Sequence, residues 1–213
     1  MGYCSLKESV TEMQTKRSGK VLVIGYGSEL RGEDRAGRIV ADRIAQWDYP
    51  RVEAISVHQP GPELAKEIAE SEMTIFVDAV SAQQPIKDIL QLAGVHPHQP
   101  NMEIASTAPR QRTSVVTNTM LIRLHAAEAG TSFGHSFTPS VLLSLARALY
   151  GRSPRAYMVA IPASRFELGD EFSPDTLAAI DEAVAMIKQL SLWVPRAIHR
   201  DHIHDLSVFA GRV

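Results

Sequence analysis

Three acidic residues and one histidine in this sequence are of the types that hold a divalent metal ion. Glu33 and Asp34 follow a glycine-containing turn in "VLVIGYGSELRGEDRAG", Asp78 stands at the end of the apolar run "IFVDAV", and His135 lies in "SFGHSFTPS". If the strands before Asp34 and Asp78 are neighbours in a sheet, two carboxylates and one imidazole meet in one crevice. Such a ligand set suits a borderline ion such as nickel or zinc and leaves coordination positions open for another protein's atoms.

Simpler roles exist for each of these residues. Acids in the first turn of a helix often only complement the helix dipole, and a histidine in a loop is usually just exposed. Asp78 is different, because a carboxylate in an apolar strand is costly unless it is paired or coordinated. We therefore take the acidic pair Glu33 and Asp34 together with Asp78 and His135 as a candidate site.

A dinucleotide site is the alternative interpretation of the glycine turn. The full fingerprint needs a third glycine where this sequence has Leu30. Glu33 and Asp34 would also repel a pyrophosphate and compete with it for the free N–H groups of the helix start. The acidic pair therefore disfavours a nucleotide.

The elements that must position these residues alternate between strands and helices. Continuous apolar runs predict buried strands, and apolar residues at helical spacing predict helices. Pro139 and Gly151 mark the start and end of one helix, and Ser173 is the N-cap of another. The expected strands cover 20–27, 52–58, 73–80 and 155–162, and the expected helices cover 33–47, 61–71, 138–151 and 173–190.

This alternation predicts an α/β fold with three α/β/α layers and a mostly parallel, twisted sheet of about five strands. In such folds, sites form at the carboxyl edge of the sheet. We expect a single domain over 20–192, an N-terminal tail over 1–19 and a C-terminal tail over 193–213. The proline-rich segment 93–114 predicts a long loop with at most a short strand at 102–105.

Composition excludes several classes of function. The formal net charge of −2 gives no basic field, so we expect neither nucleic acid nor a membrane as a partner. There is no long apolar run or signal sequence, and the single cysteine, Cys4, permits no intrachain disulfide or CxxC zinc site. We expect a cytoplasmic protein. The remaining histidines of the polar segments are expected to be surface residues: His96, His98, His199, His202 and His204.

Four blocks in order give this chain a specific resemblance over about residues 20–190. "GYGSELRGEDRAGRIVADRI", "HQPGPELAKEIAESEMTIFVDAV", "GHSFTPSVLLSLARALYG" and "VAIPASRFELGDEFSPDTLAAIDEAV" together resemble the hydrogenase maturation endopeptidases of nickel-iron hydrogenases. Ser28 and Arg35 depart from the asparagine and the glycine that the family commonly has at these places. The segment 94–133 is longer than the usual connection.

The resemblance implies an endopeptidase of aspartyl type that removes a short C-terminal extension from the hydrogenase large-subunit precursor after nickel insertion. It assigns metal binding and catalysis to Asp34, Asp78 and His135, which leaves Glu33 as a candidate assisting acid or base. The nickel would be carried by the substrate, and we expect no tightly bound cofactor of the protein's own. We further expect a monomer whose partner is the large-subunit precursor.

The mechanism stays open at this level. No HExxH helix supports a zinc-peptidase mechanism, and no serine or cysteine nucleophile arrangement is present. Two alternatives remain: a non-catalytic nickel-handling maturation chaperone with the same ligands, and a nucleotide-binding Rossmann-like enzyme.

Overall fold

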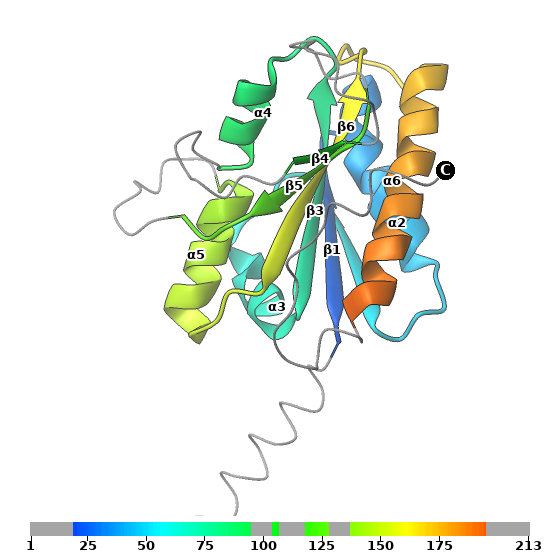
Figure 1. The fold of residues 1–213 in the computed structure, drawn as a ribbon. Coiled ribbons are helices and arrows are strands. Elements are labelled where there is room, and N and C mark those ends of the chain that lie inside the picture. The colour runs from blue at the N-terminus through cyan, green and yellow to red at the C-terminus, as the bar shows by residue number, and fades with distance from the viewer. Residues whose placement is uncertain (1–18, 95–103, 107–117, 128–136, 195–213) are drawn as a thin grey trace, which may run out of the picture.

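The computed structural model describes residues 19–94, 104–106, 118–127 and 137–194 (Figure 1). These residues form one six-stranded sheet in the order β2-β1-β3-β6-β5-β4. The strands are β1 (Val21–Tyr26), β2 (Val52–Val57), β3 (Met73–Ser81), β4 (Ile104–Ser106), β5 (Met120–Leu124) and β6 (Arg155–Ala163). His135 lies outside the described residues, as do residues 1–18 and 195–213 of the predicted tails, whereas α6 continues to Trp193, one residue beyond the predicted domain.

The sheet is mostly parallel, as predicted. β1 pairs in parallel with both β2 and β3, and β3 pairs in parallel with β6. β5 runs antiparallel to β6, and β4 runs antiparallel to β5. The sequence predicted about five strands and did not predict β5, whereas β4 overlaps the short strand predicted at 102–105.

Helices cover both faces of the sheet, which confirms the three layers (Figure 1). On one face lie α3 (Ala65–Glu70), α4 (Ile86–Leu92) and α5 (Pro139–Tyr150), and on the other lie α2 (Ala36–Ala45) and α6 (Pro174–Trp193). Two short 3₁₀ turns, η1 (Gly32–Arg35) and η2 (Pro62–Leu64), precede α2 and α3. The helix α4 was not predicted from the sequence.

The continuous apolar strands divide their side chains between two cores. Leu22 and Ile24 of β1 face the core under α3, α4 and α5, whereas Val21 and Val23 face the core under α2 and α6. Successive side chains of a strand point to opposite faces, so a strand covered on both sides must be apolar throughout. This explains why the apolar runs of the sequence predicted the central strands correctly.

The predicted signals at helix ends are confirmed. The hydroxyl of Thr138 accepts a hydrogen bond from the N–H of Val141, and Gly151 ends α5 with a φ of 73°. Ser173 caps α6 in the same way, through the N–H of Thr176. Within the described ranges, every helix is too short or too polar to cross a membrane.

Candidate functional site

Asp34 and Asp78 lie close together where β1 ends beside β3. The register pairs Gly25 with Val77, so the next position along both strands places Tyr26 beside Asp78. β1 stops at Tyr26, whereas β3 continues to Ser81 against β6. The sequence placed Asp78 at the end of its strand. In the structure, β1 ends at this level while β3 continues for three more residues. We call the place where β1 ends beside the longer β3 the step between β1 and β3, and Asp78 lies next to it.

Asp34 reaches the same step from the turn that follows β1. Its Oδ2 accepts a hydrogen bond of 2.8 Å from the N–H of Ser28, two residues beyond the end of β1. The carboxylate therefore sits over the end of β1, and its charge acts on Asp78. The sequence prediction that the loops after these two strands converge holds for this pair of aspartates.

The environment of Asp78 disfavours its charged form. Burial of the carboxyl, with the charge of Asp34 as a second cause, raises the pKa of Asp78 to about 8. Hydrogen bonds from the Tyr26 hydroxyl and from the N–H of Ala79 act in the opposite direction. A cation between the two aspartates would remove their repulsion, so the pair is arranged to favour a positive ion.

Tyr26 is a residue of this site that the sequence analysis missed. Burial, followed by the charge and the hydrogen bond of Asp78, raises the pKa of Tyr26 well above its usual value. The phenol therefore stays protonated and donates its hydrogen to the Asp78 carboxylate. Only the pairing of β1 with β3 reveals this contact, because the two residues are far apart in the sequence.

Two glycines allow backbone segments near the site to approach each other closely. Gly27 has a φ of 140°, and a Cβ at this position would lie 1.9 Å from the carbonyl oxygen of Asp34. A Cβ on Gly37 would lie 2.3 Å from the carbonyl oxygen of Val77. These glycines let the Asp34 turn fold back over β1 and let α2 pack directly against β3. The turn thus brings Asp34 to the carboxyl end of β1.

Glu33 is fully buried, with 0 % of its surface exposed. Its carboxylate accepts three backbone hydrogen bonds, from the N–H groups of Ser164 at 2.6 Å, Arg165 at 2.9 Å and Ser173 at 2.6 Å. Burial by itself would raise the pKa of Glu33, but a hydrogen bond with the Ser173 side chain and these backbone hydrogen bonds lower it to about 2. This environment favours a structural role, in which Glu33 fixes the segment 164–173, over a role as an acid or base.

Arg35, the residue after Asp34, also binds the segment 164–173. Its Nη2 donates a hydrogen bond of 2.6 Å to the carbonyl oxygen of Asp170, and its guanidinium lies 5.0 Å from the centre of the Phe172 ring. Arg35 is one of the two departures from the resembled family noted in the sequence. Its side chain adds a contact between the acidic turn and the segment 164–173.

The third predicted ligand, His135, lies outside the described residues, as does Cys4. In the part of the chain that the structure describes, no group of three or more histidine, cysteine, aspartate or glutamate side chains is placed to hold a metal ion. The structure thus brings together two of the three predicted ligands. The surface histidines predicted in the polar segments also lie outside the described residues.

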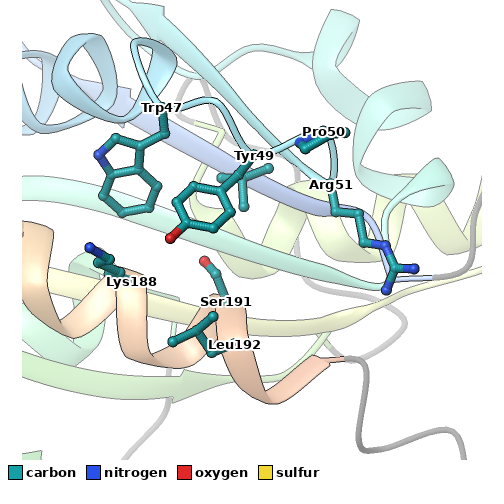
Figure 2. Close-up of a pocket in the computed structure, with 8 residues that line it drawn as sticks. Trp47, Tyr49, Pro50, Arg51, Lys188, Ser191 and Leu192 are labelled. Atoms are coloured by element: carbon teal, nitrogen blue, oxygen red, sulfur yellow. The ribbon is translucent and has the colours of Figure 1, made fainter.

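A cavity of about 230 Å³ lies at the amino end of β2, whereas Asp34 and Asp78 lie toward the carboxyl ends of the strands (Figure 2). The cavity lies between the start of β2 and the last turns of α6. In its wall, the carbonyl oxygen of Arg51 accepts a hydrogen bond from the N–H of Val21, the first residue of β1. Its lining is Trp47, Tyr49, Pro50, Arg51, Val52, Lys188, Ser191 and Leu192. Neither Asp34 nor Asp78 contributes to this cavity.

The Tyr26→Phe variant should show what the phenol does for Asp78. We expect any reaction that depends on Asp78 to slow by about 10-fold or more, the size of loss that is common when a hydrogen-bond partner that orients a ligand residue is removed. The melting temperature should change little, because one hydrogen bond contributes only about 1 kcal/mol. Turnover and thermal unfolding measured on the same preparation test this, and an unchanged rate would remove Tyr26 from the site.

Comparison with known proteins rests on structure alone. Neither protein-family models nor curated protein sequences give a match. Among solved structures, the hydrogenase maturating endopeptidase HybD from E. coli matches with a TM-score of 0.53 and 18% identity, over 84% of this chain and 94% of that chain. An endopeptidase from Escherichia coli, solved in solution, gives a TM-score of 0.52 and 18% identity, over 82% and 92% of the two chains.

A third structure agrees with these two. The [NiFe] hydrogenase maturation protease HybD from Thermococcus kodakarensis matches with a TM-score of 0.50 and 18% identity, over 81% of this chain and 99% of that chain. At such identities the likeness concerns the fold, and it extends over nearly the whole of each solved protein. The chain described here thus has the α/β fold of the hydrogenase maturation endopeptidases.

Proposed function

We propose that this protein is an endopeptidase that removes the C-terminal extension of a nickel-iron hydrogenase large-subunit precursor after nickel has been inserted. The observation that carries the proposal is the approach of Asp34 and Asp78 at the step between β1 and β3. It occurs in a chain that shares its fold with hydrogenase maturation proteases. The carboxyl edge of a mostly parallel sheet is also where α/β folds bind their ligands.

The proposal gives the two aspartates one shared task, which is to bind the nickel that the precursor carries. Both carboxylates favour the cation, because a positive charge offsets the burial and the repulsion by Asp34 that together raise the pKa of Asp78. His135 is proposed as the third ligand, since imidazole suits nickel. A precursor without nickel would lack the charge that draws the two carboxylates together, and it would therefore bind poorly.

The cleavage step needs a water molecule activated near the scissile peptide. Asp34 and Asp78 are the proposed groups, either as ligands of the ion that polarises the peptide or as the carboxylate that takes the proton from water. Tyr26 holds Asp78 in place through its hydrogen bond. Glu33 is already occupied by three backbone donors and is not needed for this step.

The decisive experiment mixes the protein with purified large-subunit precursor and follows the precursor by mass spectrometry. We expect the loss of a C-terminal peptide from the nickel-loaded precursor and no loss from the nickel-free precursor. A precursor that is bound but stays intact would identify a non-catalytic chaperone instead. Cleavage without nickel would contradict the proposed recognition of the ion.

The Cys4→Ser variant should cleave the precursor at the wild-type rate. The proposed chemistry uses carboxylates, and Cys4 is the only thiol of the chain. Rates for both proteins at one precursor concentration are sufficient for this test. A variant that folds normally but does not cleave would require a thiol mechanism.

A further inference from the structure

Two large apolar side chains protrude into solvent beside the candidate site. Leu30 is 72% exposed and Leu168 is 82% exposed, which are the two highest values among the exposed large apolar side chains of the described residues. Leu30 belongs to the turn that carries Asp34, since its N–H donates to the hydroxyl of Ser28 and the N–H of Ser28 donates to Asp34. The exposed leucines therefore lie close to the proposed catalytic carboxylates.

The backbone holds the two leucines next to each other. Arg31 and Gly169 form a parallel bridge, in which the carbonyl oxygen of Leu30 accepts a hydrogen bond of 3.3 Å from the N–H of Gly169. The N–H of Gly32 donates a hydrogen bond of 2.9 Å to the carbonyl oxygen of Gly169. Leu30 and Leu168 each precede a residue of this bridge, so they are neighbours in register.

This pair of leucines rests on a fixed support. The buried carboxylate of Glu33 binds three N–H groups of the segment 164–173, and Arg35 binds the carbonyl oxygen of Asp170. A Cβ on Gly32 would lie 3.0 Å from the carbonyl oxygen of Arg165, which shows how closely the two loops approach. The exposure of the leucines is thus a property of a well-connected pair of loops.

Charged side chains of both signs surround the leucines. The exposed members of this rim are Arg31, Arg165, Glu167, Asp170 and Glu171. An apolar centre inside a polar rim is the usual anatomy of a protein–protein interface. A rim with both signs, and with more acids than bases, does not favour nucleic acid or an anionic membrane.

We propose that Leu30 and Leu168 form a docking surface for an apolar patch on the folded precursor protein that is cut at the Asp34–Asp78 site. This inference rests on the proposed function. The partner is a protein surface because the leucines adjoin a site whose proposed substrate is a protein, and because the rim is mixed in charge. Docking there would hold the precursor while its C-terminal extension enters the site, and it would contribute to binding more than to the chemical step.

The test compares a Leu30→Ser/Leu168→Ser double variant with a Leu149→Ser control. Leu149 is 62% exposed, but it lies near the end of α5, away from the two loops. For nickel-loaded precursor, we expect the double variant to raise KM at least 10-fold with kcat unchanged, and the control to keep the wild-type KM. Calorimetric binding of the precursor should weaken by the same factor. An unchanged KM and affinity in the double variant would overturn the docking surface.

Two further measurements keep this result separate from folding and from the proposed function. A Leu30→Met/Leu168→Met variant keeps the apolar surface and should retain the wild-type KM even if the serine variant proves less stable. If the wild type binds the precursor without cutting it, the peptidase proposal fails, and the binding data alone decide on the docking surface. Sedimentation of the wild type, but not of the double variant, with phosphatidylcholine vesicles would assign the leucines to a membrane and overturn the proposal.

Discussion

Asp78→Asn is expected to fold with a melting temperature equal to or above that of the wild type while cleaving nickel-loaded precursor at least about 100-fold more slowly. Asparagine keeps the shape of the side chain and can still accept a hydrogen bond from Tyr26. It removes the repulsion with Asp34, which contributes to raising the pKa of Asp78 to about 8. The loss of rate should be large, because even residues that only orient a metal ligand commonly change affinity or activity by about 10–100-fold.

In the metal-free protein, the contribution of Asp78 to the free energy of unfolding should depend on pH. The folded protein raises the pKa of Asp78 from 3.8 to about 8, so it holds a proton that the unfolded chain releases. The contribution of Asp78 is therefore most favourable below about pH 4 and is lost as pH rises toward 8. Asp78→Asn should abolish this decline, which melting curves between pH 5 and pH 8.5 can detect.

Asp42→Asn is a matched control for this variant. Asp42 is an exposed aspartate of α2, and its replacement should leave the rate of cleavage unchanged. If Asp78 only satisfied backbone donors, its replacement would instead destabilise the fold by about 1–3 kcal/mol. A clear drop in melting temperature together with retained cleavage would remove Asp78 from the proposed site.

Glu33→Ala should be among the most destabilising single substitutions in the chain, lowering the free energy of unfolding by about 4 kcal/mol or more. The change removes three hydrogen bonds to a buried carboxylate and leaves three backbone N–H groups without that acceptor. Chemical denaturation at pH 7 measures the loss. The comparison variant is Glu53→Ala, which breaks the exposed 2.6 Å ion pair of Glu53 with Lys20 and should cost at most about 1 kcal/mol.

Acid should reduce the difference between the wild type and Glu33→Ala. The folded protein lowers the pKa of Glu33 from 4.5 to about 2, so the unfolded chain takes up the proton first as pH falls. The stability that Glu33 provides is fully present above about pH 4.5 and is lost as pH falls through about 2. A Glu33→Ala protein with wild-type stability but no cleavage would show that Glu33 acts as an acid or base after all.

The local elements of this protein are largely determined by its sequence. The apolar runs of β1 and β3 identify strands because a sheet covered on both faces buries every side chain. Pro139, Gly151 and Ser173 identify the ends of α5 and α6 because such signals act within a few residues. The local sequence pattern did not predict the five-residue β5 or the seven-residue α4. Both are short elements that contacts with the rest of the fold stabilise.

The arrangement around Asp34 depends on contacts between distant parts of the chain. The sequence identified Asp34 and Asp78 as candidates by their place after apolar strands, but only the pairing of β1 with β3 brings them together and sets Tyr26 beside Asp78. The sequence showed two adjacent acids, Glu33 and Asp34, with no sign of their different roles. The fold separates them, because the backbone donors that hold Glu33 lie more than 130 residues along the chain. Local spacing carries no information about such partners, and burial beside them decides which acid is structural and which faces the site.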